Sequence, residues 1–472
     1  MNTPIIFILI PMALSAILLL IPRATKVSTA ATCITSVLLA ILATLLPEDL
    51  TLTFADYRLV LGDSLAVLGR TLSITSADLT LVAWIFTLTL LWNLPARRFH
   101  ISNYFNALSL GIAALWIAVL AVRPFLYAAL IVELIALLSV PLLSPRGGQA
   151  GSGLLRYLVF QTVGMAMILL SGWLLSGVET APSASPLTLQ AAALVLFGCA
   201  LWLAVFPVHS WMPMIGEESH PWVVTFLLGL SQTALIIFLL YFLDRYAWLR
   251  NLPGLFDILS WAGVFTIAVA GLLAAFQKDL RRIFGYLFLA ETGYALLAVG
   301  LSRQGGLNYL ALLLAPRALG YWLWGFTLSE LLRLEPGGDT RFSGLKGLFT
   351  RRQWISSLII FDMLSLTGLP LLAAFPAKRM LWNLLADQNA GLLSWLILGI
   401  LGILALTLRL LRDLFEPSPQ PAEPGNQSET LSFKIISGAV VLLQVLIGLL
   451  PFLFLPGFLR ILEPFTILLP AA

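Results

Sequence analysis

The sequence has little charge and almost no cysteine or histidine. Only 11% of its 472 residues are charged and 60% are hydrophobic, whereas a typical soluble domain has roughly 25% charged residues. This balance excludes an ordinary soluble enzyme and places the chain in a membrane. Cys33 and Cys199 each lie in an apolar run without a second cysteine nearby. They therefore indicate neither a disulfide framework nor a metal site.

Patterns that bind metals or cofactors are also missing. The 3 histidines are too few and too poorly placed to clamp a haem between helices. The sequence contains no cysteine cluster for an iron–sulfur centre and no dinucleotide-binding fingerprint. We therefore expect no catalytic residue, bound cofactor or metal in this chain. The net charge of +4 needs no nucleic-acid partner, because basic residues commonly flank membrane spans.

Long apolar runs are abundant. A run of about 20 apolar residues can cross a bilayer as a helix, and fourteen such runs can be marked, of which the seventh and twelfth are overlong. The first has no basic start, so we expect a retained helix rather than a cleaved signal peptide. The runs lie near 4–22, 27–46, 77–94, 104–122, 124–143, 154–175, 187–214, 222–243, 257–276, 283–301, 308–332, 354–387, 391–412 and 433–455.

The connections between the runs suggest an orientation. Most of the 27 Lys and Arg residues fall on alternate connections, which the positive-inside rule assigns to the inner side. This predicts both termini on the outer side of what we expect to be a bacterial inner membrane. The alternating "LTLTFADYRLVL" in the outer loop 47–77 predicts a short surface hairpin. The inner "PSPQPAEPGNQSE" predicts a flexible linker, and residues 456–472 fit either an interfacial or an inserted segment.

Prolines interrupt two of the runs. Pro207 lies in the seventh run, and Pro370 and Pro376 lie in the twelfth, five runs later. A proline inside a span frees a backbone carbonyl, which must then find a partner in protein or trapped water. Interrupted helices in corresponding halves indicate inverted repeats around a hydrated path. For each proline taken alone, a packing kink is the alternative.

Isolated ionisable side chains give a second signal. A charge at the centre of a bilayer is costly unless it is paired or hydrated. Several together in one bundle favour a polar proton track, although each alone fits a snorkelling side chain or a structural ion pair. His209, beside the first break, either satisfies opened backbone or carries a proton. The charged residues within runs are Glu133, Glu291, Arg317, Asp362 and Lys378.

These segments resemble the antiporter-like membrane subunits of respiratory complex I, a family shared with multi-subunit cation/proton antiporters and membrane-bound hydrogenases. The similarity covers about residues 120–390. "VELIALLSVPLL", with Glu133, resembles the family's fifth helix, and "FPVHSWMP" resembles its broken seventh helix. "QKDLRRIFGYLFLAETGY" is similar to a helix-entry motif, and "LSLTGLPLLAAFPAK", ending at Lys378, resembles the broken twelfth helix. Details lean toward the N-type subunit, near the quinone-binding end of the complex.

The resemblance implies a fold and a set of partners. It implies an all-α membrane protein with about 14 helices, two inverted five-helix repeats (spans 4 to 8 and 9 to 13) and broken helices 7 and 12. The chain then divides into an N-terminal three-helix segment (1–103), two repeats (104–243 and 244–412) and a linker with a C-terminal helix (413–472). Expected partners are lipid, protons and other membrane subunits, and those subunits would hold the quinone, flavin and iron–sulfur clusters.

The chain departs from the family at three relay positions. Trp202 and Gln232 stand where the family has lysines, and Glu291 stands where a histidine is common. A buried lysine beside a glutamate can hold and release a proton, whereas an indole or an amide cannot. Two interpretations stay open. The chain either translocates protons along a rewired path through His209, Glu291, Arg317, Asp362 and Lys378, or is a structural subunit with a closed channel. Related alternatives are a subunit of a membrane hydrogenase, a cation/proton antiporter or an inorganic-carbon uptake complex.

Overall fold

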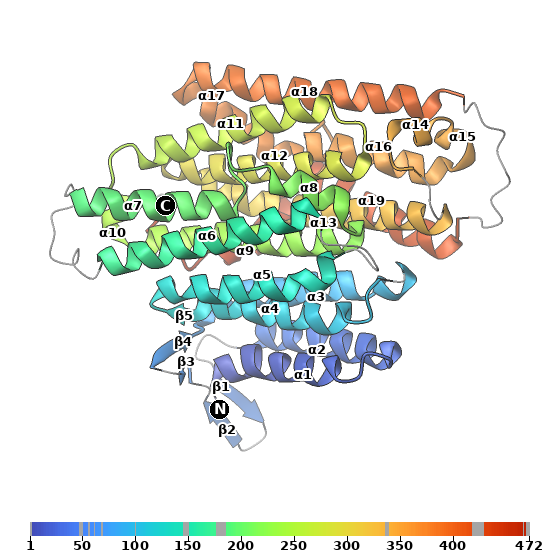
Figure 1. The fold of residues 1–472 in the computed structure, drawn as a ribbon. Helices are drawn as coiled ribbons and strands as arrows, with labels where there is room; N and C mark the ends of the chain where they lie inside the picture. Colours follow the sequence, from blue (N-terminus) through green and yellow to red (C-terminus); the bar gives the residue numbers. More distant parts are fainter. Residues whose placement is uncertain are drawn as a thin grey trace.

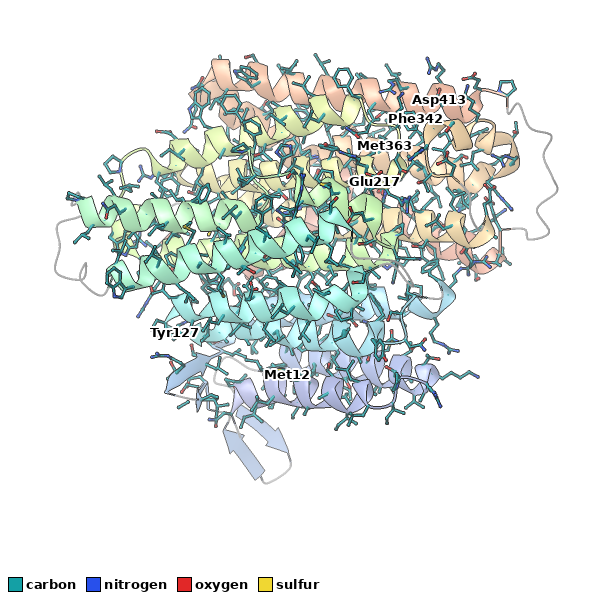
Figure 2. The ribbon with its side chains drawn as sticks, viewed as in Figure 1. Met12, Tyr127, Glu217, Phe342, Met363 and Asp413 are labelled. Atoms are coloured by element: carbon teal, nitrogen blue, oxygen red, sulfur yellow. The ribbon has the colours of Figure 1, made fainter. Side chains whose placement is uncertain are left out.

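Long helices lie side by side in stacked layers (Figure 1), and α19 (Leu431–Leu449) and α20 (Pro451–Leu459) return to pack on α13 (Gly306–Leu334) in the middle of the stack. The computed structural model describes residues 2–468 except 47–50, 55–56, 61, 68, 100, 145–150, 176–185, 336–338, 418–428 and 466. Helices α1 (Ile10–Leu19) and α2 (Thr25–Leu45) form one end of the stack, and α17 (Phe375–Gln388) and α18 (Ala390–Phe415) form the other. Side chains fill the space between the layers (Figure 2).

Helices dominate the described residues because a helix satisfies its own backbone groups in a bilayer. The other helical elements are η1 (Ile5–Leu9), η2 (Ser76–Asp78), α3 (Leu79–Asn93), η3 (Ala96–Phe99), α4 (Phe105–Ala121), η4 (Phe125–Tyr127), α5 (Ala128–Leu143), α6 (Ser152–Leu175), α7 (Pro186–Trp202), α8 (Trp211–Glu218), α9 (Pro221–Arg245), α10 (Ala247–Arg250), α11 (Leu255–Ala275), α12 (Leu280–Gly300), η5 (Ser302–Gln304), α13 (Gly306–Leu334), α14 (Phe342–Leu345), α15 (Leu348–Arg351), α16 (Gln353–Thr367), α19 (Leu431–Leu449), α20 (Pro451–Leu459) and η6 (Arg460–Leu462).

The predicted membrane-spanning character is confirmed. Within the described ranges, nine helices are long and apolar enough to cross a bilayer, and five shorter apolar helices accompany them. The last predicted run, 433–455, is wrong at its end: α19 stops at Leu449 and Pro451 begins α20, because a proline cannot continue the helical hydrogen bonding. Helix α20 packs on α13, and its Phe458 ring meets the Trp84 ring edge-on at 5.3 Å. The predicted linker at 417–429 lies almost entirely outside the described residues.

The predicted surface hairpin is two hairpins in the structure. Strand β1 (Thr51–Phe54) pairs antiparallel with β2 (Tyr57–Val60), with Thr51 opposite Val60. Strand β3 (Ser64–Val67) pairs with β4 (Arg70–Ser73), and β4 also pairs with the short β5 (Val122–Arg123), which follows α4. Gly69, between β3 and β4, has a φ of 73°, a left-handed conformation that glycine adopts without strain. The stretch with alternating apolar and polar residues therefore forms one hairpin, and the residues that follow it form a second.

Glycines bring three helices into backbone contact. A Cβ atom on Gly263 of α11 would lie 2.6 Å from the Gly293 carbonyl oxygen of α12. A Cβ atom on Gly399 of α18 would lie 2.6 Å from the Ile267 carbonyl oxygen of α11. Small residues allow this close approach, which is a common means of helix association in membranes. We call these contacts of α11 with α12 and α18 the glycine seam.

A buried carboxylate ties three elements together at one end of the bundle. Glu330 of α13 accepts hydrogen bonds from Arg98 of η3 at 2.6 and 2.7 Å, and from Arg333 at 2.8 and 3.0 Å. Arg98 also donates to the hydroxyl of Thr430, the N-cap residue of α19, at 2.5 Å. The N-terminal layer is thereby joined to α13 and α19 through paired, charge-assisted bonds.

Two spans are interrupted where the prolines predicted. The first break separates α7, which ends at Trp202, from α8, which begins at Trp211, and Pro207 lies within it. The second separates α16, which ends at Thr367, from α17, which begins at Phe375, and contains Pro370. Pro376 is not in the break itself but in the first turn of α17, where its missing N–H costs no helical bond.

Candidate functional site

A buried ion pair lies where the second break meets α12. Lys378 of α17 donates to Glu291 of α12 at 2.5 Å, and the two side chains are 1% and 2% exposed. The Lys378 ammonium group also lies 4.3 Å from the centre of the Tyr294 ring. Two opposite charges taken out of water together stabilise each other, whereas either one alone would be left uncompensated.

The break itself places the lysine. Residue 370 is a proline, so the Leu366 carbonyl has no N–H donor four residues along the chain. Lys378 donates a hydrogen bond to that carbonyl. Gly368 makes room for the lysine stem, because a Cβ atom there would lie 2.8 Å from Lys378 Cδ, and its φ of 87° is left-handed. One ammonium group therefore satisfies both the opened backbone and the Glu291 carboxylate.

Two further charges lie close to this pair. Arg317 of α13 and Asp362 of α16 are 2% and 1% exposed, and Tyr321 of α13 is within electrostatic reach of both and of Glu291. A Cβ atom on Gly320, one turn after Arg317, would lie 3.4 Å from Asp362 Oδ1. Met363, next to Asp362 and labelled in Figure 2, is fully buried. Four helices thus bring two acids and two bases together, and we call Glu291, Arg317, Asp362 and Lys378 the charge cluster.

The first break is satisfied by neutral groups instead. The Trp202 indole donates to the Gln161 carbonyl at 3.0 Å, and the Gln232 amide donates to the Trp202 carbonyl at 3.2 Å. The Trp211 indole donates to the Leu201 carbonyl at 3.2 Å. The Gln232 amide and the Trp211 indole thus satisfy carbonyls at the end of α7, as Lys378 does at the end of α16, whereas the Trp202 indole binds a carbonyl of α6. None of these three neutral groups can exchange a proton near neutral pH.

Little space remains beside the first break. Trp202 is fully buried, and the cavity that it lines together with Tyr157 and Gln232 has a volume of about 20 Å³. Such a volume holds about one water molecule. Gln232 accepts a 3.4 Å hydrogen bond from Thr292, the residue after Glu291. The charge cluster and the first break are therefore adjacent but are joined through neutral groups.

Glu133 and His209 lie apart from the charge cluster in their described contacts. Glu133 of α5 accepts a hydrogen bond from Thr162 of α6 at 2.7 Å, while its second oxygen is buried without a partner. His209 contacts its own loop, since its Nδ1 atom lies 3.2 Å from the Pro207 carbonyl oxygen. The structure thus groups four of the six predicted path residues, and the roles of all six stay predictions.

Several site residues carried no sequence signal. Tyr294 and Tyr321 are aromatic positions in apolar helices, and Gln444 of α19 is one amide in a long apolar run. Their burial against the charge cluster depends on which face each helix turns inward. Tyr321 alone had a local clue, because it follows Arg317 by four residues and so shares its face. Within the described residues, no three His, Cys, Asp or Glu side chains are grouped to hold a metal ion.

Known proteins share this sequence pattern and fold. Residues 157–404 match the family model described as NADH:quinone oxidoreductase/Mrp antiporter, transmembrane. NADH-quinone oxidoreductase subunit N of Psychrobacter arcticus is 30% identical over 275 residues, which are 57% of this chain and 55% of that protein. The matched part thus spans about half the length of this curated relative.

The fold is similar to chains of two membrane complexes. A chain of respiratory complex I from Thermus thermophilus has a TM-score of 0.72 and 22% identity, covering 94% of this chain and 98% of that one. A chain of the Mrp complex from a Dietzia species has a TM-score of 0.75 and 17% identity, covering 98% and 97%. With the family match extending over the charge cluster, this chain belongs to the NADH:quinone oxidoreductase/Mrp antiporter membrane family.

Proposed function

We propose that this chain is a proton-translocating, antiporter-like subunit of a complex I-type quinone oxidoreductase. We further propose that protons pass through residues 244–412, here called the second half, and not through residues 104–243, the first half. The observation that carries the proposal is the buried pair of Lys378 and Glu291 at a helix break. A lysine that is charged inside the membrane must be paired or hydrated, and such residues commonly mark proton or ion paths. The N-type relative named above supports this assembly.

The proposed topology has fourteen crossings with both termini outside, in a bacterial inner membrane. This topology is supported by the nine long apolar helices and the five shorter apolar ones of the described residues, and by the two spans that are each broken into two helices, α7 with α8 and α16 with α17. Residues 1–103 are the N-terminal segment, 104–243 and 244–412 are inverted repeats, and 413–472 are the linker and last helix. The breaks between α7 and α8 and between α16 and α17 would each lie in the fourth span of a proposed repeat, which supports an inverted-repeat arrangement.

The charge cluster gives a physical basis for proton movement. While Lys378 is protonated, its ammonium group is bonded to Glu291 and to the Leu366 carbonyl. If the pair separates, the low dielectric no longer supports an isolated ammonium group, and the proton moves to water or to another base. Movement of α17 relative to α12 would therefore change proton occupancy. Such coupling is what a redox-driven subunit requires.

The first half is proposed to be closed. Trp202 and Gln232 occupy the positions of the family's lysines, and the cavity beside them has room for about one water. Glu133 is left with Thr162 as its bonded partner. The second candidate function follows from the same observation: if the second half were also silent, the chain would be a scaffold on which neighbouring subunits pack.

The parent assembly supplies the redox chemistry in this proposal. Quinone, flavin and iron–sulfur clusters belong to partner subunits, and this chain contributes lipid contacts, subunit contacts and the proton path. The structural likeness to an Mrp complex chain keeps a cation/proton antiporter as an alternative assembly, along with a membrane hydrogenase or an inorganic-carbon uptake complex. Purification of the complex from its native membrane, followed by identification of its subunits, distinguishes these assemblies.

Substitution in the assembled complex tests conduction. We expect Lys378→Ala and Glu291→Gln to lower the proton-to-electron ratio measured in sealed membrane vesicles. The matched control is Arg379→Ala, which removes the exposed cation next to Lys378 in the chain and should leave the ratio unchanged. A normal ratio in both cluster variants would contradict conduction through this chain and favour the scaffold.

A further inference from the structure

The charge cluster and the neighbouring Gln444 contain buried polar atoms that lack a well-formed hydrogen bond to protein. Both carboxylate oxygens of Asp362, both terminal nitrogens of Arg317 and the Nε2 atom of Gln444 are buried without a hydrogen-bond partner, as is Glu291 Oε2. Burying such groups unpaired is costly. Where donors and acceptors face one another in this way, ordered water usually bridges them. These atoms therefore outline a hydrated space beside the Lys378–Glu291 pair.

Asp362 occupies a particular place in this space. It lies one helical turn before Leu366 on α16, so it shares the helix face whose freed carbonyl binds Lys378. On the side of α13, a Cβ atom added to Gly320 would lie 3.4 Å from Asp362 Oδ1, so the carboxylate lies close to this glycine. Asp362 is thus the carboxylate that lies between the second break and the Arg317 face of α13.

Helix α19 closes the other side of the space. Gln444 is fully buried, and its side-chain amide lies within reach of a weak hydrogen bond to Asp362. Its Oε1 atom accepts a 2.6 Å hydrogen bond from Ser365 of α16. That bond fixes the amide so that its NH₂ group remains available on the side of the unpaired carboxylate. A neutral donor held in this way can orient a bridging water or a protonated carboxyl group.

We propose that Asp362 is the proton acceptor that follows Lys378, and that Gln444 and Arg317 position it. This inference rests on the proposed function. In the step, an N–H bond of the Lys378 ammonium group breaks, a bridging water relays the proton, and an O–H bond forms on Asp362. Lys378 and Asp362 become neutral, and Arg317 remains as the cation that balances Glu291. The net charge of the four groups is zero before and after the step.

The step has a consequence for the route through the chain. Asp362 lies on α16, which ends at the second break, and Gln444 lies on α19, which follows that break. The step from Lys378 to Asp362 therefore uses groups of α16 and α19, whereas Gln232 reaches the cluster through Thr292 of α12. The second half can conduct while the first half stays closed.

Infrared difference spectroscopy on the assembled complex tests the step directly. On addition of the electron donor, we expect a protonated-carboxyl band that is lost in Asp362→Asn and present in Asp387→Asn, an exposed aspartate at the end of α17. Asp362→Asn should also lower the proton-to-electron ratio to the value of Lys378→Ala. Asp362→Glu, which keeps a carboxylate, should retain a shifted band and restore part of the ratio.

The outcomes separate the step from the broader function. If Lys378→Ala lowers the ratio while Asp362→Asn leaves both band and ratio unchanged, the step is wrong and the proposed function stands. If Lys378→Ala and Glu291→Gln both pump normally, the step and the proposed function are both contradicted. Should Asp362→Asn fail to assemble, Gln444→Leu carries the test, because loss of the amide donor should shift the frequency of the band. An unshifted band would then contradict the positioning by Gln444.

Discussion

Lys378 and Glu291 meet at 2.5 Å inside the bundle, although 87 residues of chain separate them. Each is the counter-ion of the other, and their side chains are almost completely excluded from water. Because one member is an acid and the other a base, residues 244–412 contain a buried acid–base pair of their own. The pair joins α12 to the second break and makes that break a charged site and not only a kink.

Removing one member of the pair should destabilise the chain more than removing both. Glu291→Gln leaves the Lys378 ammonium without its counter-ion, at a cost of about 3–5 kcal/mol. Combining Glu291→Gln with Lys378→Met should recover much of this loss. Thermal unfolding of the purified complex in one detergent measures the order. A double variant that is as unstable as the two single losses added together would contradict the pairing.

Gly368 is expected to tolerate no side chain. Gly368→Ala forces a left-handed residue, costing roughly 1–3 kcal/mol, and places a Cβ atom 2.8 Å from the Lys378 stem. We expect a lower unfolding temperature and a lower proton-to-electron ratio. Gly457→Ala on α20, where a Cβ atom would meet nothing within 4 Å, is the control and should change neither quantity.

Lysines restored in the first half should reopen it if the closure is only local. Trp202→Lys removes the indole that lines the small cavity, and Gln232→Lys supplies the second relay group. We expect the double variant to raise proton translocation, measured in vesicles at equal electron flux. An unchanged rate in a correctly assembled complex would show that residues other than Trp202 and Gln232 also keep the first half closed to protons.

Glu330 should be a stability determinant. Glu330→Gln weakens four charge-assisted bonds from Arg98 and Arg333, and we expect a loss of about 3 kcal/mol. The control is Glu416→Gln, which breaks the partly exposed pair with Lys346 and should have a much smaller effect. Equal unfolding temperatures for the two variants would contradict the clamping role of Glu330.

The pair of Lys346 and Glu416 predicts a weak pH dependence outside the spans. The Lys346 ammonium, 2.8 Å away, holds the pKa of Glu416 below its usual range. A carboxyl group with a depressed folded pKa stabilises the protein above its unfolded pKa, and this contribution is lost as pH falls through the folded pKa. The difference in unfolding temperature between wild type and Glu416→Gln should therefore be present at neutral pH and vanish in acid.

The prolines and buried charges made part of this site predictable. Pro207 and Pro370 located both breaks, because a missing N–H in a membrane span has local consequences that sequence shows. Lys378, Glu291, Arg317 and Asp362 stood out because charge is rare in apolar runs. Their grouping was predicted only as a polar track, since the sequence did not say which of the six path residues would meet.

Other features depended on orientation that the sequence does not encode. Helices α12 and α13 are buried on nearly all sides, so hydrophobic periodicity cannot tell which face meets the cluster. Tyr321 of α13 was missed for that reason. Gln444 was missed because α19 is apolar on its exposed faces as well, so the sequence did not show that this amide faces inward. The end of α19 at Leu449 was missed because the residues after Pro451 are as apolar as those before it.

The glycine seam has an electrical consequence. Where α11 meets α12 and α18 through bare backbone, there is no gap wide enough for a file of water molecules. Water and hydrated ions therefore have no path along these contacts, on a face of the same helix that carries Glu291. The seam is a dry, insulating wall beside the charge cluster.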